Sequence, residues 1–154
     1  MYVIGVDPGK TGAAATIMDG ELIKVVPFNG DIELCRAIGE GPYSGGATYF
    51  IERVTASPNM GVVGAFTFGR WAEAVEGAAR FTRNEVHMVR PAVWQNTIGV
   101  FSAGNKTTLY EFAKTKFPVA HKLKMFNKAT SDAVLIAYYG WRYMRNKEKT
   151  NATG

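Results

Sequence analysis

Three acidic residues occupy positions where the chain is otherwise apolar. Asp7 follows the run IGV at 4–6, Glu52 follows YFI at 49–51, and Asp132 opens a segment that continues with alanine, valine, leucine and isoleucine. An unpaired carboxylate buried in such surroundings costs several kcal/mol in order of magnitude. Each of these acids therefore needs a compensating partner.

A divalent cation shared by the three acids would supply that partner. If the strands that precede Asp7 and Glu52 are neighbours in one sheet, their ends lie about 5 Å apart, the spacing between strands. A ligand set of oxygen atoms alone favours Mg²⁺, with Mn²⁺ as the alternative. Two such ions about 4 Å apart activate water on one side of a phosphodiester and stabilise the departing oxygen on the other. The acids thus predict nuclease chemistry with up to two ions.

Each acid also has a local explanation. Asp7 suits an Asp-Pro-Gly turn, Glu52 can pair with the adjacent Arg53, and Asp132 suits the positive end of a helix dipole. The local view needs three unrelated explanations, whereas one cation site accounts for all three acids. We therefore favour the joint explanation.

The elements that must position these acids form an α/β pattern. Strand-like runs span 2–7, 13–18 and 21–26, and the dipeptide Asp19-Gly20 suits a two-residue hairpin between the last two. Two further runs are predicted to be strands, at 47–51, ending at Glu52, and at 86–89. We expect a mixed five-stranded sheet, with three antiparallel N-terminal strands and then parallel strands, flanked by helices.

Helices are predicted from apolar spacing and from proline and capping signals. They span 31–38, 62–81, 91–98 and 107–117, and a last one runs from an N-cap at Thr130 or Ser131 to about Arg145. We expect one domain over 1–146 and a frayed tail over 147–154.

Composition limits the class of protein. The 154 residues are 47% hydrophobic and 20% charged, which fits one globular domain and excludes intrinsic disorder. No apolar run approaches the roughly 20 residues of a membrane span, so no membrane partner is expected. A single cysteine, Cys35, and the lack of a leader pattern before Met1 favour a reducing cytoplasm.

Positive charge gathers toward the C-terminus. Residues 1–100 hold 8 Lys/Arg and 10 Asp/Glu, a net −2, whereas residues 101–154 hold 10 and 3, a net +7. Lysines mixed with Phe117, His121 and Phe126 suit phosphate contact and base stacking, so a nucleic acid is the expected partner. A solvated lysine-rich surface is the alternative. The lysines are Lys114, Lys116, Lys122, Lys124 and Lys128.

Five stretches resemble RuvC-type Holliday-junction resolvases, phage-encoded ones in particular. Three contain the acids: IGVDPGKTG at 4–12, FIERV at 50–54 and SDAVLIA at 131–137. The other two are FTFGR at 66–70 and VRPAVW at 89–94. The resemblance covers nearly the whole chain. It implies a ribonuclease H-like fold, a homodimer, and Mg²⁺-dependent cutting of four-way DNA junctions by two symmetric nicks, in the cytoplasm of a bacterial host.

The resemblance also implies roles for single residues. Asp7 would bridge two metal ions, Glu52 would bind one of them and Asp132 the other. Lys106, which follows SAGN at 102–105, matches the family's basic residue near the scissile phosphate. A loop lysine in front of a helix is the alternative for Lys106.

The DNA contacts implied by the resemblance centre on a loop and a basic surface. The loop over 55–64 with Met60, followed by Phe66, lies where the family places side chains at the junction crossover, and apolar insertion between bases helps to open or bend DNA. Burial in the core is the alternative for Phe66. The expected DNA-binding residues are Lys10, Met60, Phe66, Arg70, Lys114, Lys122, Lys124 and Lys128.

The chain departs from the family at the fourth metal ligand. The family usually has an Asp or His shortly before the last acid, where this chain reads NKATS at 127–131. Asn127 or Ser131 offers a neutral oxygen, and Lys128 offers an ammonium beside the phosphate, with a surface lysine as its alternative. Losing one negative charge weakens the ion held by Asp132. A junction-binding protein with weak or lost cleavage is therefore the alternative to an endonuclease.

Two other classes have less support. The string DPGKTG at 7–12 also resembles the first phosphate loop of actin-like and sugar-kinase ATPases, but 154 residues do not accommodate their second nucleotide-binding lobe. A ribonuclease H that cuts RNA–DNA hybrids is disfavoured by the motif over 60–70.

The helix at 62–81 is the expected dimer interface. Its apolar positions are spread too widely around the helix to be buried on one side only.

Overall fold

The structure is a computed structural model that describes residues 1–9, 11–30, 33, 37–38, 46–53 and 60–152. Lys10, Cys35, most of the helix expected at 31–38 and the loop over 55–59 lie outside the described residues.

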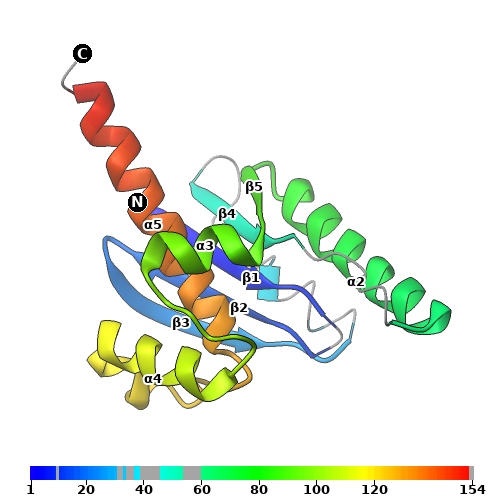
Figure 1. Ribbon diagram of the computed structural model, residues 1–154. Helices are drawn as coiled ribbons and strands as arrows, with labels where there is room; N and C mark the ends of the chain where they lie inside the picture. The colour runs from blue at the N-terminus through cyan, green and yellow to red at the C-terminus, as the bar shows by residue number, and fades with distance from the viewer. Residues whose placement is uncertain (10, 31–32, 34–36, 39–45, 54–59, 153–154) are drawn as a thin grey trace.

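A five-stranded mixed sheet forms the centre of the molecule (Figure 1). β1 (Tyr2–Asp7), β2 (Ala13–Met18) and β3 (Glu21–Pro27) are antiparallel neighbours. β4 (Ala47–Glu52) pairs in parallel with β1, and β5 (Glu85–Val89) pairs in parallel with β4, which gives the order β3-β2-β1-β4-β5. The predicted sheet is confirmed, with strand ends that differ by a residue at most.

The β2–β3 hairpin forms as its sequence predicts. Asp19 and Gly20 have positive φ angles of 50° and 95°, the backbone that a tight two-residue turn requires. The turn places β3 at one edge of the sheet, while β5 forms the other edge.

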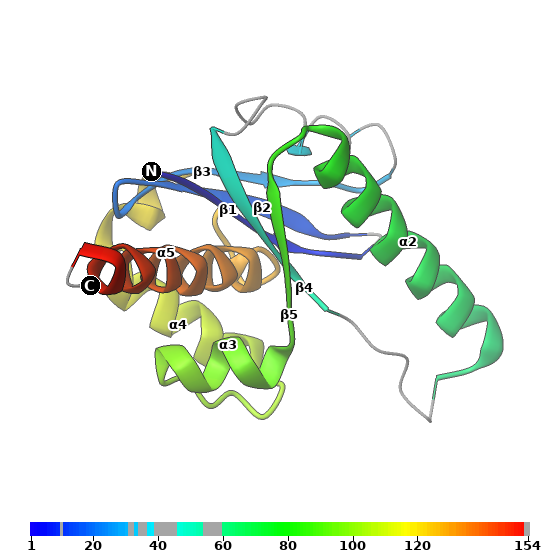
Figure 2. The ribbon, with the colours of Figure 1, turned by 90° about the horizontal axis from the view of Figure 1, so that it is seen from above.

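In the part of the chain that the structure describes, α-helices and a short 3₁₀ helix surround the sheet. α3 (Pro91–Ile98), α4 (Lys106–Lys116), the 3₁₀ helix η1 (Pro118–Lys122) and α5 (Ser131–Ala152) lie on one face, and α2 (Val62–Phe81) packs on the other (Figure 2). The predicted helices are confirmed at these positions. In the described part of the chain, none of the helices combines the length and hydropathy of a membrane span.

α5 is longer than predicted. It continues to Ala152, past the end predicted near Arg145, so residues 147–152 of the expected tail are helical. Two features extend the helix: most residues of RNKEK at 145–149 are good helix formers, and the Arg145 guanidinium lies 4.9 Å from the centre of the Trp141 ring. The last turns project past the end of the sheet (Figure 1).

The alternation of side chains along the strands divides the core into two layers. Val3 and Phe50 face α3, α4 and α5. Their neighbours Ile4 and Ile51 face the opposite side, where the buried residues of α2 pack. The residues that continue the first alternation, two positions past Gly5 and Phe50, are Asp7 and Glu52, so both acids lie on the α5 side.

α5 lies directly on β1 at Gly5. A Cβ atom at this position would lie 2.1 Å from the Ala137 nitrogen and 2.4 Å from the Ala133 oxygen, so a larger side chain does not fit. A second close contact joins Gly140 to the Phe50 ring, 2.3 Å from where a Cβ would stand. These two contacts set the position of α5 above the strands, and with it the position of Asp132.

We expect Gly5→Ala to lower the free energy of unfolding by roughly 3 kcal/mol, because the added methyl group overlaps backbone atoms of α5 that have no room to move. Urea denaturation measures this. The matched control is Gly77→Ala, in the exposed interior of α2 with nothing within 4 Å of the new Cβ, which should be neutral or stabilising by up to about 1 kcal/mol. Equal effects at the two positions would contradict the close packing of α5 on β1.

Candidate functional site

Asp7 and Glu52 occupy the ends of two adjacent parallel strands. In the β1–β4 pair Val6 stands opposite Ile51, so the two acids are the next residues along neighbouring strands. The predicted adjacency of these strands is confirmed, and their spacing of about 5 Å brings the two acids together at the carboxyl ends of the strands.

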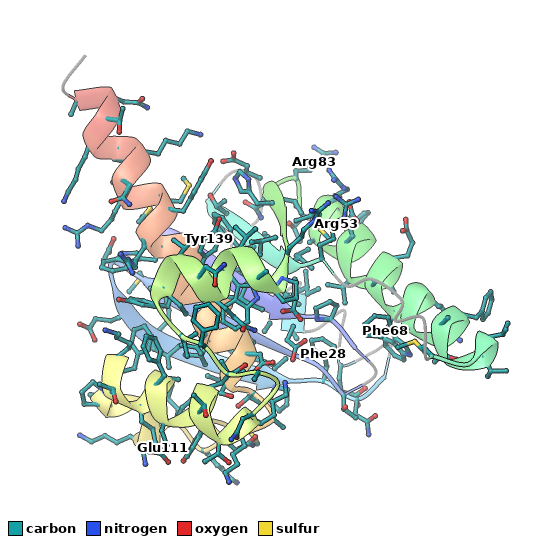
Figure 3. The ribbon with its side chains drawn as sticks, in the orientation of Figure 1. Phe28, Arg53, Phe68, Arg83, Glu111 and Tyr139 are labelled. Carbon is teal, nitrogen blue, oxygen red and sulfur yellow. The ribbon has the colours of Figure 1, made fainter. Side chains whose placement is uncertain are left out.

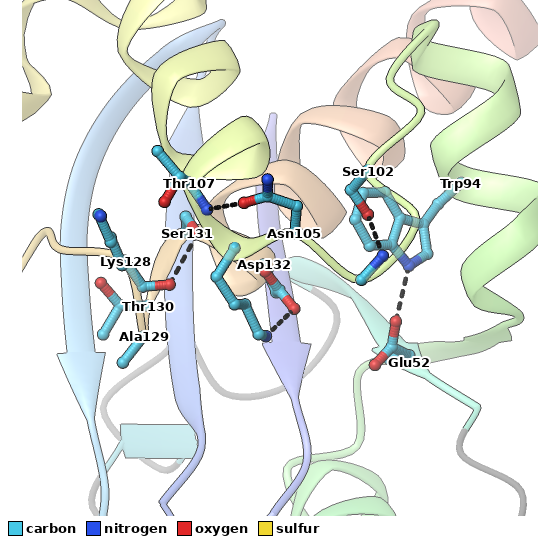
Figure 4. A network of polar contacts seen from close by, with 12 residues as sticks. Glu52, Trp94, Ser102, Asn105, Thr107, Lys128, Ala129, Thr130, Ser131 and Asp132 are labelled. Carbon is cyan, nitrogen blue, oxygen red and sulfur yellow. Dashed lines mark hydrogen bonds and ion pairs between the residues drawn. The ribbon is translucent and has the colours of Figure 1, made fainter.

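Asp132 reaches the same place from α5. It lies in the first turn of the helix, and its side chain is 10% exposed. Oδ2 forms an ion pair with the Lys106 ammonium, whereas Oδ1 is buried and has no hydrogen-bond partner among the described residues. Figure 4 shows the carboxylates of Asp132 and Glu52 on the same side of the sheet.

Glu52 is held by a tryptophan. The indole Nε1 of Trp94 donates a hydrogen bond of 2.9 Å to Glu52 Oε1 (Figure 4). This partner takes the place of the pairing with Arg53 that was the local alternative. Trp94 belongs to the motif VRPAVW, but no role was predicted for it; the available signal is its position three residues after Pro91, on the inner side of a helix.

A short structured loop positions Lys106 as the first residue of α4. Asn105 caps the helix, with Oδ1 accepting from the Thr107 nitrogen at 2.9 Å. The Gly104 nitrogen donates to Ser102 Oγ at 3.2 Å, and Ala103 has a φ of 46°. Lys106 is therefore fixed at a helix start, with its ammonium directed to Asp132.

The ionisable groups of the site act on one another. Burial raises the pKa of Asp7 to about 7, with further raising by Asp132 and Glu52 and lowering by Lys106. Burial also raises the pKa of Glu52, opposed by the hydrogen bond from Trp94. Burial lowers the pKa of Lys106, but the hydrogen bond to Asp132 and the charges of the three acids outweigh it and the net pKa is raised. Four groups far apart in sequence thus share one electrostatic environment.

The donors suit a hard cation, although their present orientation does not enclose one. Among the described residues, no three His, Cys, Asp or Glu side chains stand together as a ready metal site. The Lys106 ammonium is paired with Asp132 Oδ2, which keeps that oxygen from a cation shared with the other acids. The unpartnered Asp132 Oδ1 and the all-carboxylate donor set nevertheless match the chemistry of Mg²⁺ or Mn²⁺.

The region that lacks the fourth acidic ligand is occupied by local contacts. Asn127 Oδ1 accepts from the Ala129 nitrogen at 2.8 Å, and Ser131 Oγ donates to the Lys128 oxygen at 3.0 Å. Lys128 is exposed. The two neutral oxygens therefore stabilise the turn that leads into α5.

The residues expected at the junction crossover lie at the start of α2. Phe66 is 76% exposed, so its burial in the core, the alternative considered, is wrong. Met60 is partly exposed just before the helix, and the Arg70 guanidinium lies 5.8 Å from the centre of the Trp71 ring.

The expected DNA-binding lysines gather around α4 and η1. Lys114 is on α4 and forms an ion pair of 3.1 Å with Glu111. Lys122, at the end of η1, and Lys124, just after it, are exposed. The structure places these lysines on the same side of the sheet as the acids.

Comparison with known proteins identifies the fold. No protein-family model matches the chain, and no curated protein matches it at a significant level. Thermus thermophilus RuvC in complex with a Holliday junction substrate matches with 16% identity and a TM-score of 0.69, over 94% of this chain and 96% of that one. A second T. thermophilus RuvC structure matches with 17% identity and a TM-score of 0.65, over 96% and 97%. This chain has a RuvC-like fold. The relation to the phage-encoded branch stays a prediction.

We expect Asp7→Asn to stabilise the metal-free protein at alkaline pH. The folded-state pKa of Asp7 is about 7 against an ordinary value of 3.8. The folded state therefore binds more protons than the unfolded state between these values, and stability falls as the pH rises through them. Removing the carboxylate should flatten this slope and raise the free energy of unfolding at pH 8 by a few kcal/mol at most, since each pKa unit corresponds to about 1.4 kcal/mol.

Urea denaturation in EDTA at pH 5 and pH 8 measures the difference. Glu73→Gln, at an exposed position of α2, is the control and should leave the slope unchanged. A slope in Asp7→Asn equal to that of the unsubstituted protein would contradict a buried, crowded carboxylate at position 7.

Proposed function

We propose that the protein is a structure-selective, metal-dependent endodeoxyribonuclease that resolves four-way (Holliday) DNA junctions by paired symmetric nicks. The observation that carries this proposal is that Asp7 and Glu52, at the carboxyl ends of β1 and β4 in a RuvC-like sheet, lie near Asp132, with Lys106 beside them. The RuvC neighbour that is described with a Holliday junction substrate supports this substrate class. A phage-encoded enzyme acting in a bacterial cytoplasm fits this proposal.

The three acids would hold the metal, with Asp7 between the other two. Up to two Mg²⁺ ions, or Mn²⁺, would activate water and stabilise the departing oxygen when bound. Trp94 fixes the orientation of Glu52 through its indole hydrogen bond. Lys106 forms an ion pair with Asp132, and its ammonium would be available to the scissile phosphate if a bound cation took its place beside Asp132.

Binding of the DNA backbone falls to the exposed lysines on the same side of the sheet. Lys122, Lys124 and Lys128 offer ammonium groups to phosphates, together with Lys114 on α4. Lys10, which lies outside the described residues, is included in the proposal on its position in the sequence. Met60 and Phe66 are assigned to the branch point, and Arg70 to DNA binding. Their place just before α2 and in its projecting first half supports contact with DNA outside the acid site.

A junction-binding protein with weak or lost cleavage is the second candidate. Two observations favour it: the turn before Asp132 lacks an acidic fourth ligand, and Lys106 already engages Asp132. Both features lower the affinity of Asp132 for an ion.

A homodimer formed through α2 completes the proposal, because two symmetric nicks need two sites. α2 buries only Trp71, Val75 and Ala79 against the sheet. Four of its other large apolar residues are exposed to between 76% and 87%: Val62, Val63, Phe66 and Phe81. Figure 2 shows the first half of α2 extending away from the sheet.

We expect the protein with Mg²⁺ or Mn²⁺ to nick a synthetic four-way junction at paired symmetric positions. Asp7→Asn should reduce the rate at least about 100-fold, because the central metal-holding carboxylate is lost, while junction binding in a mobility-shift assay stays. Glu73→Gln is the control and should cut normally. A junction that is shifted but never cut supports the binding protein instead, and cleavage of RNA–DNA hybrids without regard to branching would indicate a ribonuclease H.

We expect a dimer at micromolar concentration in sedimentation equilibrium, and Val63→Asp should convert it to a monomer because the change places a charge on the exposed apolar side of α2. Glu73→Lys changes charge on the same helix at a position without apolar exposure and serves as the control. A monomer in the unsubstituted protein, with and without DNA, would refute the α2 interface.

A further inference from the structure

A groove follows the β5 edge of the sheet and continues along α5. Its first part, about 440 Å³, lies between the ends of β4 and β5, the start of α3 and the middle of α5. Its second part, about 300 Å³, lies between α3 and the last turns of α5. Tyr139 and Tyr143 line both parts, so the two form one edge groove. Figure 3 labels Arg53 and Tyr139 at two points along it.

Aromatic rings form the middle of the edge groove. The His87 ring stacks on Phe50 with centres 4.8 Å apart and an angle of 16°. Tyr143 lies 5.7 Å from each of these rings and is 42% exposed. An exposed ring backed by two others offers a rigid face on which a flat heterocycle can stack.

Cations stand on both sides of these rings. Arg53 and Arg90 line the end near β4 and β5, and both are exposed. Among the described residues, no ion pair joins either guanidinium to a carboxylate. Arg142 and Lys147 line the other end, along α5. No acidic residue of the described chain lines either part, so both ends of the edge groove carry positive charge; an acid beside its middle is Glu85, whose Oε1 lies 3.0 Å from His87 Nε2.

The edge groove differs from the proposed active site and from the lysine surface in the residues that line it. Arg53 directly follows Glu52, and Val93 directly precedes Trp94, so the edge groove begins beside the acids, but none of Asp7, Glu52 and Asp132 lines it. α4, with its lysines, lies toward the β3 edge, whereas the edge groove follows the β5 edge (Figure 1). The function proposed above therefore leaves it unused.

We propose that the edge groove binds a single strand of nucleic acid, with a base stacked on Tyr143, which His87 and Phe50 support from behind, and phosphates on the flanking arginines. Alternating cations and exposed rings are the chemistry by which single strands are bound without regard to sequence. A duplex hides its base faces, so it would make only the phosphate contacts. This inference adds a binding site to the proposed endonuclease and does not depend on cleavage.

Fluorescence anisotropy with a labelled oligothymidylate, in EDTA, tests this inference on the full chain. Tyr143→Ala should weaken binding about tenfold, as expected for the loss of one stacked base. Tyr143→Phe keeps the ring and should bind as the unsubstituted protein does. Arg90→Ala should weaken binding and lower its salt dependence. Arg145→Ala removes the same charge from α5 outside the edge groove, over Trp141, and should change the affinity less than twofold.

The arms of the experiment separate the possible outcomes. An oligouridylate of equal length distinguishes RNA from DNA as the source of the strand, and tight binding of either, sensitive to Tyr143→Ala, supports the inference. Weak binding of both oligonucleotides would overturn it. Binding that survives Tyr143→Ala and Arg90→Ala but is lost in the double variant of Lys122→Ala and Lys124→Ala would assign the strand to the lysine surface and also overturn it. Circular dichroism confirms that each variant is folded, and junction cleavage is scored separately.

Discussion

The contact between Gly5 and α5 is the constraint on which the candidate site depends. Because residue 5 has no side chain, the helix backbone at Ala133 and Ala137 lies against β1 itself. Asp132, one residue before Ala133, is thereby held above the strand end that carries Asp7. A helix seated one side chain higher would separate the two carboxylates by several ångströms, and the shared electrostatic environment would be lost.

Bringing the acids together has an energetic cost that the fold offsets in part. The raised pKa values of Asp7 and Glu52 show that burial and mutual repulsion disfavour their charged forms. Lys106 and the indole of Trp94 relieve some of this, through an ion pair and a hydrogen bond. The rest of this cost, from burial and mutual repulsion of the carboxylates, would be relieved by a bound cation. The crowding of the acids that destabilises the metal-free protein therefore favours the proposed ligand.

The sequence predicted most of the fold because its local signals agree with one another. β-branched runs, the Asp19-Gly20 turn and Pro91 each determine their own segment, and the strands and helices appear where expected. The acids could be recognised because carboxylates after apolar strands are unusual. Trp94 could not be assigned its role, because a buried tryptophan on an amphipathic helix has the same pattern whether or not its indole has a polar partner.

The longer extent of α5 and the edge groove were also beyond prediction, for a different reason. Helix ends depend on weak propensities summed over several residues, and Arg145 gains a ring contact with Trp141 that only the folded helix provides. The edge groove depends on which residues of β4, β5, α3 and α5 become neighbours. Phe50 and Tyr143, which are more than 90 residues apart in the sequence, meet there, and spacing along the chain carries no information about such a meeting.

The first half of α2 has a thermodynamic consequence. Residues 62–70, VVGAFTFGR, include two glycines and three β-branched residues, which are poor helix formers, and the first buried residue of the helix is Trp71. An isolated helix tip of this kind has little to offset the conformational entropy lost on ordering it. A second copy of the chain or a nucleic acid that covered this tip would therefore spend part of its affinity on holding the first turns of α2 in the helical form that the structure shows.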